Sequence, residues 1–304
     1  MNEENEKEVA AVAAAFNPGH LTPTHLLNAS VYMADATRRT TEALLRVLTQ
    51  EAMCRLLHEE RFANPARLER YGFKVFSQND EDGILQEILR RIGADHRMFF
   101  EFGSGNGLEN CTHYLLAQGW SGVWADTDTA LADATRKTFE SYAESLRVET
   151  AHITAENINS RVDELRLPEN LDVLVIDIDG NDYYVWEALE AIKPRIVVIE
   201  YNASLPPPVR LVQAYNPELR WNGTRYFGAS LMALADLGVR KGYQLVGCNI
   251  SGVNAFFVRQ ELARDGAWDR SLSPVELFHP PRFELGFYGF GGHPAGVGPW
   301  RAFP

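Results

Sequence analysis

The sequence has few cysteines and no cluster of basic residues. Its 304 residues include three cysteines, Cys54, Cys111 and Cys248, which are odd in number and far apart. Their spacing matches neither a zinc site nor a disulfide framework, which predicts buried thiols in a reducing compartment. The formal net charge is −12, and no basic run interrupts the acidic balance. Because an acidic chain repels polyphosphate, we expect no nucleic-acid partner.

Segments that insert into membranes are also lacking. Residues 1–6, Met-Asn-Glu-Glu-Asn-Glu, have neither the basic start nor the apolar core of a signal peptide. No apolar run approaches the ~20 residues that a transmembrane helix needs. We therefore expect a cytoplasmic protein with no membrane partner.

From residue 98 onward, apolar runs of strand length alternate with segments of helical spacing. This alternation predicts an α/β fold, with a mixed seven-stranded sheet and helices on both faces. The last two strands are expected to form an antiparallel pair at a sheet edge. The expected strands are residues 99–102, 122–125, 147–153, 171–176, 195–199, 243–248 and 255–259, and the expected helices are residues 84–92, 110–118, 129–146, 158–165, 183–192 and 228–238.

Two further segments flank this predicted domain, which we place at residues 71–270. Residues 1–70 contain no convincing strand, and apolar residues from Leu26 to Leu48 recur at helical spacing. We expect a helical N-terminal extension that acts as a cap or in dimerisation, and we favour a homodimer. Residues 271–304 are rich in glycine and aromatics. This tail and the proline-rich segment 203–227 are candidate lids, unless the tail has no function.

A glycine turn is the most informative stretch of the chain. Residues 99–107, Phe-Phe-Glu-Phe-Gly-Ser-Gly-Asn-Gly, run from an apolar strand into glycines, and a helical segment follows. Such a turn presents bare backbone N–H groups to a polar ligand. The dinucleotide fingerprint needs a glycine where Leu108 stands, and the turn lacks the lysine and following Ser or Thr of a phosphate-binding loop.

Two acidic residues near the turn indicate which kind of ligand it binds. Glu101, on the strand side, would repel a pyrophosphate and suits a ligand that carries an ammonium group. Asp126 follows Gly103 by 23 residues, where an acid can accept both hydroxyls of a ribose. The pattern thus favours a cationic nucleoside over a dinucleotide.

Acidic residues also follow other predicted strands. Asp126 ends the second strand, Asp177 and Asp179 follow the fourth, and Glu200 ends the fifth. In open α/β sheets ligands bind beyond the carboxyl ends of the strands. We therefore predict a single site at this edge of the sheet.

Over about residues 75–260 the sequence resembles class I S-adenosylmethionine-dependent methyltransferases, and within them it looks most like the FkbM-like group. The resemblance implies a Rossmann-like fold and a methyl-transfer activity. It is carried by Ser77-Gln78, Glu81-Asp82-Gly83, residues 101–107, residues 177–183, residues 198–202 and residues 252–258.

The resemblance implies a site for S-adenosylmethionine. The glycine turn would contact the methionine part through backbone, and Glu101 would stabilise its amino end, directly or through water. Asp126 would bind the ribose, and Asp177 would sit beside the sulfonium. Thr127, or the segment 152–154, would border the adenine. The implied cofactor-binding residues are Gln78, Glu101, Gly103, Ser104, Gly105, Asn106, Asp126, Thr127, Ile153 and Asp177.

The acceptor chemistry depends on the acids at the strand ends. The candidate catalytic residues are Asp177, Asp179, Asp182, Glu200 and Asn202. Asp177, Asp179 and Glu200 supply hard oxygen ligands, which suit Mg²⁺ or another divalent cation. In the similar catechol-type enzymes an asparagine directly follows the second acid, whereas Tyr201 intervenes here. The alternative is that these acids bind the ammonium group of an acceptor.

The predicted substrate residues are Tyr183, Trp221, Arg225 and Tyr226, with Arg225 as the candidate partner of a carboxylate. Where FkbM-like sequences carry an acidic pair after a glycine, this chain has Asn181-Asp182. The leading hypothesis is O-methylation of a small molecule in secondary metabolism. The alternatives are N- or S-methylation of a free amino acid, such as a thioether, and a non-catalytic cofactor-binding or scaffold domain.

Overall fold

The computed structural model of the chain describes residues 23–263, 268, 272–282 and 292–303. Its contacts divide the chain between Leu56 and Leu57 into two compact units. Unit 1 holds most of a long helix, and unit 2 holds an α/β domain.

The helix α2 (Pro23–Leu57) is 35 residues long and begins where a helix is predicted. Ion pairs between side chains three or four residues apart, such as Arg38 with Asp35 and Glu42, lie along it. Among the described residues, no helix combines the length and the apolar character needed to cross a membrane. Large apolar side chains of α2 are exposed, namely Leu27, Val31, Tyr32, Met33, Leu44, Val47 and Leu48.

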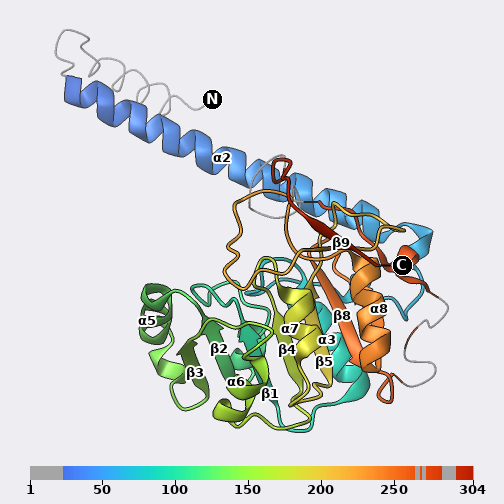
Figure 1. The fold of residues 1–304 in the computed structure, drawn as a ribbon. Helices are drawn as coiled ribbons and strands as arrows, with labels where there is room; N and C mark the ends of the chain where they lie inside the picture. The colour runs from blue at the N-terminus through green and yellow to red at the C-terminus, as the bar shows by residue number, and fades with distance from the viewer. Residues whose placement is uncertain (1–22, 264–267, 269–271, 283–291, 304) are drawn as a thin grey trace. The chain divides into compact units, whose positions relative to one another are not determined.

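Unit 2 contains a mixed seven-stranded sheet, which confirms the predicted Rossmann-like fold (Figure 1). Five neighbouring strands, β3, β2, β1, β4 and β5, are mutually parallel, and β8 runs antiparallel to both β5 and β7. The edge pair is therefore antiparallel, as predicted. In spatial order the strands are β3 (Leu146–Thr150), β2 (Ser121–Asp126), β1 (Met98–Phe102), β4 (Val173–Ile176), β5 (Ile196–Glu200), β8 (Asn254–Arg259) and β7 (Tyr243–Cys248).

Helices cover both faces of the sheet. Since successive side chains of a strand point to opposite faces, each face has its own buried cluster. Along β4, Val173 and Val175 belong to one buried cluster, whereas Leu174 and Ile176 belong to the other. The first cluster includes residues of α3 (Glu81–Ile92), α4 (His113–Ala117) and α5 (Thr129–Thr138), and the second includes residues of α6 (Ile158–Leu165), α7 (Asp182–Ala188) and α8 (Leu231–Lys241).

Some predicted helices are shorter in the structure. The helix expected at residues 129–146 ends at Thr138, because Phe139 turns inward onto Trp124 with ring centroids 4.8 Å apart and a short 3-10 turn, η4 (Glu140–Tyr142), follows. The helix expected at residues 110–118 begins only at His113. The glycine turn is thus separated from α4 by further loop residues.

Residues 57–70, which we assigned to the helical extension, pack with the α/β domain. They include the short 3-10 helix η2 (Glu60–Phe62) and lead into η3 (Glu69–Tyr71). Glu69 is fully buried and accepts hydrogen bonds from Arg67 at 2.6 Å and from the ring of His279 at 2.9 Å. Burial acts to raise the pKa of Glu69, but the bonds from His279 and Arg67 outweigh it and lower that pKa. This cluster ties the segment to the short helix α9 (Pro274–Leu277), two residues before His279.

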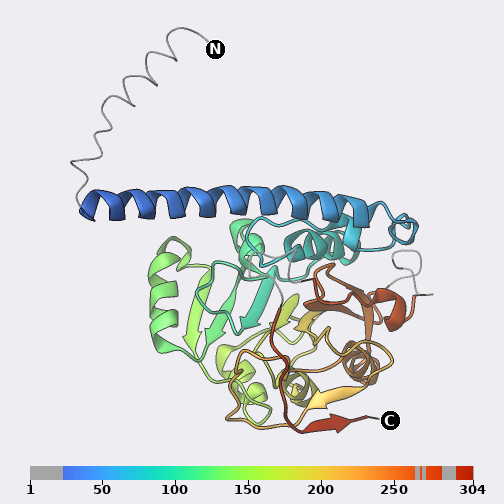
Figure 2. The ribbon, with the colours of Figure 1, turned by 90° about the horizontal axis from the view of Figure 1, so that it is seen from above.

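A small second sheet was not predicted. In it, β6 (Leu211–Gln213) pairs antiparallel with β9 (Trp300–Ala302), seen in Figure 2 as a gold arrow beside the red C-terminal one. Three-residue strands are too short for a periodic signal. Of the predicted tail lid at residues 271–304, residues 283–291 lie outside the described residues. The described part from residue 292 runs back along the segment 203–227.

The ends of β1 and β4 approach closely at Gly103. The φ angle of Gly103 is +80°, and a Cβ atom there would lie 1.4 Å from the carbonyl oxygen of Asp177. Gly105 also has a positive φ, of +51°, but a Cβ there would meet nothing within 4 Å. Only glycine fits the first position, because both the conformation and the space exclude a side chain.

We expect Gly103→Ala to destabilise the chain much more than Gly105→Ala. The second change adds only the strain of a left-handed alanine, about 1–2 kcal/mol. The first adds an overlap with backbone, and its loss should exceed about 4 kcal/mol. Denaturant unfolding of both variants measures the difference, and equal losses would contradict the close approach.

Candidate active site

A cavity of about 490 Å³ opens at the carboxyl ends of β1, β2, β4 and β5. This volume lies within the range of small-molecule sites. The cavity brings together side chains from strand ends that are far apart in the sequence, as the parallel order of the strands requires. The predicted site residues that line it are Gln78, Gly103, Gly105, Asp126, Thr127, Ile153, Asp177, Asp179, Glu200 and Trp221.

The glycine turn differs from the expected cradle of bare N–H groups. The N–H groups of Gly103 and Ser104 both donate to the carbonyl of Ala125, at 2.9 and 3.2 Å. The N–H of Gly105 donates to a carboxylate oxygen of Asp126 at 2.8 Å. These three donors are used within the protein because the turn folds back onto the end of β2. Gly103 and Gly105 of the turn line the cavity.

Asp126 is fixed by two backbone groups. One oxygen accepts from Gly105 and the other from the N–H of Asp128, each at 2.8 Å. A carboxylate oxygen has lone pairs for more than one hydrogen bond, so Asp126 can still accept from a ligand hydroxyl. Thr127 and Ile153 line the cavity next to it, and Ile153 adds an apolar wall.

Glu101 lies outside the cavity lining, contrary to the predicted contact with the cofactor. It is buried and accepts from the N–H groups of Cys111 and Thr112, at 2.9 and 3.1 Å, and from the Thr112 hydroxyl at 2.5 Å. Burial raises the pKa of Glu101 to about 7, although these hydrogen bonds act to lower it. The side chain of Glu101 therefore accepts hydrogen bonds from the backbone N–H groups that precede α4 in the sequence.

Ser104 and Asn106 are also absent from the lining. Ser104 is buried, and among the described residues its hydroxyl has no hydrogen-bond partner. Asn106 is exposed and accepts from the N–H of Leu108 at 3.0 Å, which shapes the turn locally. The sequence placed both residues at the cofactor because they belong to the glycine turn, but their side chains point elsewhere.

Asp182 and Asn202 serve the backbone around the site. Asp182 is buried, and its two oxygens accept from the N–H groups of Ile178 and Gly180, each at 2.8 Å. Between these two lies Asp179, with an unusual positive φ of 56°. Burial raises the pKa of Asp182 to about 6. Asp182, which was predicted to be catalytic, therefore lies outside the cavity lining and holds the backbone on both sides of Asp179.

Asn202, which was also predicted to be catalytic, lies outside the cavity lining as well. It is fully buried, and its side-chain amide donates to the carbonyls of Arg225 and Phe227, at 2.8 and 2.9 Å. These bonds hold the end of the segment 203–227 against the end of β5. Phe227 lines the cavity, so Asn202 acts on the site through this loop.

Three predicted substrate residues hold the C-terminal segment instead of lining the cavity. The hydroxyl of buried Tyr183 accepts from Arg240 at 2.7 Å, and its ring packs near Phe303. The hydroxyl of Tyr226 donates to the carbonyl of Pro299 at 2.6 Å. The guanidinium of Arg225 donates to the carbonyl of His293 at 2.7 Å. Of the four, only Trp221 lines the cavity.

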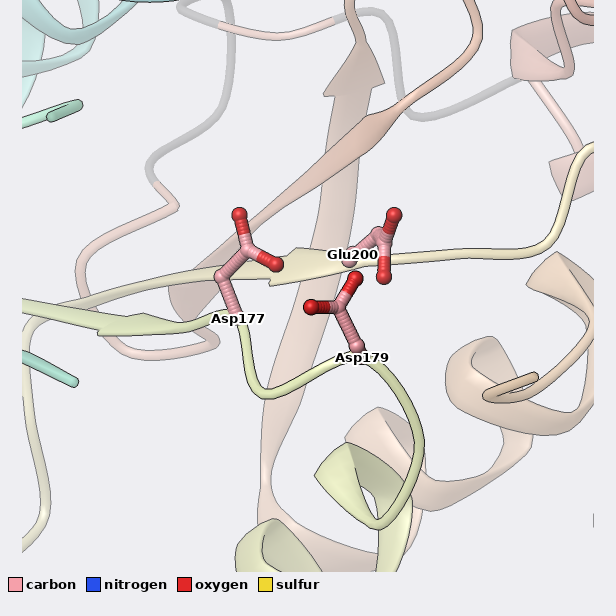
Figure 3. A group of neighbouring side chains, drawn as sticks. All are labelled: Asp177, Asp179 and Glu200. Carbon is pink, nitrogen blue, oxygen red and sulfur yellow. The ribbon is translucent and has the colours of Figure 1, made fainter. Parts of the chain in front are cut away.

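Asp177, Asp179 and Glu200 form a tight acidic group (Figure 3). One oxygen from each lies within 4.8 Å of the others, across the ends of β4 and β5. Burial raises the pKa of all three, and repulsion from neighbouring carboxylates raises it further, although His293 acts to lower the pKa of Asp179. Among the described residues, Glu200 Oε2 has no hydrogen-bond partner. A cation bound here would relieve this repulsion.

Sequence reasoning missed cavity residues of two loops. Glu218 and Arg220 line the cavity from the segment 203–227, and His293 lines it from the C-terminal part of the chain. The ring of His293 stands edge-on to Trp221, with centroids 4.7 Å apart. No spacing or motif marks these residues individually, because loop contacts bring them to the site. The available signals were the prediction of both segments as candidate lids and the position of Arg220 next to the predicted Trp221.

No protein-family model and no curated protein matches the sequence. Among solved structures, the N-terminal domain of EvdMO1 with SAH bound is similar at a TM-score of 0.40 and 14% identity, over 69% of this chain and 94% of that chain. The CurJ carbon methyltransferase is similar at a TM-score of 0.39 and 9% identity, over 59% of this chain. This chain spans about half of that chain's length, 52%.

A third solved structure is an O-methyltransferase family protein from Burkholderia thailandensis. Its TM-score is 0.36 and its identity 13%, over 59% of this chain and 58% of that chain. Likenesses this distant assign neither a family nor an activity to this chain. Its own residues must therefore support any functional assignment.

Proposed function

We propose that this chain is an S-adenosylmethionine-dependent methyltransferase of small molecules, of the FkbM-like kind. The observation that carries the proposal is the shared cavity. The glycine turn, the ribose-type acid Asp126 and the apolar Ile153 line the same space as the acidic group at the ends of β4 and β5. A nucleoside site and a reaction site are thus adjacent, as methyl transfer needs.

The cofactor roles follow the cavity lining. Gly103, Gly105 and Gln78 border the methionine part, and Asp126 accepts from the ribose hydroxyls. Thr127 and Ile153 border the adenine. Asp177 lies beside the sulfonium, since a carboxylate stabilises a positive charge at short range.

The acceptor in this proposal is a hydroxyl group. Its oxygen forms a bond to the methyl carbon while the carbon–sulfur bond breaks, and the electron pair stays on sulfur to give S-adenosylhomocysteine. The hydroxyl proton passes to a carboxylate of the acidic group. Carboxylates with raised pKa values accept a proton more readily than ordinary ones.

As an alternative to a proton-accepting role, we propose that Asp177, Asp179 and Glu200 hold Mg²⁺ or another divalent cation. Three carboxylates within 4.8 Å of one another and the unpartnered Glu200 Oε2 fit such an ion. When bound, the ion would favour loss of the acceptor's proton. The three carboxylates would hold the ion, and Asp182 fixes the backbone on both sides of Asp179 through hydrogen bonds.

Methylation of nitrogen or sulfur in a free amino acid is the second candidate. The same acidic group, without a metal, fits the ammonium group of an amino acid, and Arg220 lines the same cavity. A thioether sulfur loses no proton on methylation, so the acids would then serve binding alone. A non-catalytic cofactor-binding or scaffold domain is the third candidate.

We propose that the chain forms a homodimer through the exposed apolar residues of α2. Seven large apolar side chains are exposed on this one helix, and a second copy would bury them. We also propose a cytoplasmic location. Of the three cysteines, which all lie in the described part of the chain, Cys111 and Cys248 are buried as predicted, whereas Cys54 is exposed. Buried thiols suit a reducing compartment.

S-adenosylhomocysteine should bind the chain, and Asp126→Asn should weaken binding about tenfold or more, since hydrogen bonds to a charged group contribute about 1.5–3 kcal/mol. Titration calorimetry measures both affinities. Asp163→Asn is the matched control, because Asp163 is an exposed acid of α6 outside the cavity. Absence of binding to the unaltered chain would rule out both enzymatic proposals and favour a scaffold.

Mg²⁺ should bind in the presence of S-adenosylhomocysteine, and Asp179→Asn should weaken Mg²⁺ binding about tenfold or more because it removes one ligand charge. Glu218→Gln is the matched control, since Glu218 lines the cavity outside the acidic group. Equal effects of the two variants would oppose the metal proposal. So would methyl transfer to a screened metabolite that persists in the presence of a chelator.

Light scattering should give the mass of a dimer for the full chain and of a monomer for Leu44→Glu/Leu48→Glu. Charged side chains at these exposed positions would disrupt an apolar interface. Gln50→Glu, an exposed polar position of the same helix, should leave the dimer intact. A monomeric unaltered chain would refute the dimer.

A further inference from the structure

Arg220 stands out among the charged groups of the cavity. Five carboxylates line the same space, from Asp126, Asp177, Asp179, Glu200 and Glu218. In the described part of the chain, Arg220 is the only lysine or arginine of the lining, and it forms no hydrogen bond or ion pair there. Arg220 is exposed, and a guanidinium that lines an acidic cavity without pairing with its carboxylates is open to a ligand.

The loop that carries Arg220 is anchored on both sides. Before it, the carbonyl of Asn216 accepts from the side-chain amide of Asn181 at 2.7 Å. Leu219 packs against Gly180, where a Cβ atom would come within 2.8 Å of its side chain. After it, the indole of Trp221 donates to the carbonyl of Thr224 at 2.8 Å. These contacts place the segment that carries Arg220 next to the loop that connects β4 and α7.

We infer that the methyl acceptor carries a carboxylate that pairs with Arg220. This inference rests on the proposed function. A guanidinium binds a carboxylate through two parallel hydrogen bonds, which also fixes the orientation of the ligand. A phosphate suits the same geometry, but its second negative charge would be repelled more strongly by the five carboxylates of the lining. The acceptor is thus an acid, whether a hydroxy acid or an amino acid.

In this proposal Arg220 does not bind the carboxylate of the cofactor. In the proposed binding mode, the methionine part of S-adenosylmethionine lies at the glycine turn and Gln78, after β1. Arg220 instead lies beside Leu219, whose side chain packs on Gly180 after β4. Acceptor binding and cofactor binding should therefore respond differently to a change at Arg220.

Calorimetry on the full chain with S-adenosylhomocysteine and Mg²⁺ present tests the inference with two matched pairs of probes. The first pair is 3,4-dihydroxybenzoate and catechol, and the second is L-methionine and 3-(methylthio)propylamine. In each pair the two differ by the carboxylate. In at least one pair, the probe with the carboxylate should bind about tenfold or more tighter than the probe without it. Arg220→Gln should abolish that preference, and Arg220→Lys should restore part of it.

Arg225→Gln is the matched control, because Arg225 does not line the cavity and was the carboxylate partner expected from sequence. It should keep the preference. No preference in either pair, or a preference that survives Arg220→Gln, would overturn the inference. Stronger competition by inorganic phosphate than by acetate would overturn the choice of a carboxylate.

The same titrations separate this inference from the proposed function. If S-adenosylhomocysteine fails to bind the unaltered chain, the proposed function fails. If it binds the unaltered chain and Arg220→Gln equally, but the acids show no preference, only the inference about the acceptor fails. A loss of S-adenosylhomocysteine binding in Arg220→Gln would assign Arg220 to the cofactor instead.

Discussion

The close approach of β1 and β4 governs the candidate site. The carbonyl of Asp177 occupies the space where any residue but glycine at position 103 would place its Cβ atom. Parallel pairing of the two strands brings their ends to this point. The glycine turn and the acidic group therefore share one cavity. A wider separation of the strand ends would leave a nucleoside site and an acidic site apart, without the contact that group transfer needs.

The acidic group sets the second constraint. Three carboxylates held within 4.8 Å repel one another, and burial adds to the rise of their pKa values. A fold keeps such an arrangement only where the surroundings fix it. Asp182 supplies that support, since it binds the backbone on both sides of Asp179 and stabilises its positive φ. A metal ion or a ligand ammonium group would each relieve the repulsion.

Several residues that motif reasoning assigned to chemistry instead hold the structure in place. Glu101 binds the backbone before α4, and Asn202 fixes the loop that carries Phe227. Tyr226 and Arg225 hold the C-terminal segment. A polar residue beside a motif can serve either the ligand or the loop that shapes the site. Sequence spacing does not separate these roles, because both require the same residue types at a strand end.

Apolar runs such as residues 171–176 and the turns between them predicted the strands, the helices and their succession along the chain, because this periodicity is local. The sequence also predicted that Asp126, Asp177, Asp179 and Glu200 gather at one edge, because parallel strands end together. It did not predict which polar groups reach the cavity, because that depends on contacts between segments far apart in the chain. Arg220 enters it through a loop without periodicity, and its position depends on the distant contact of Leu219 with Gly180.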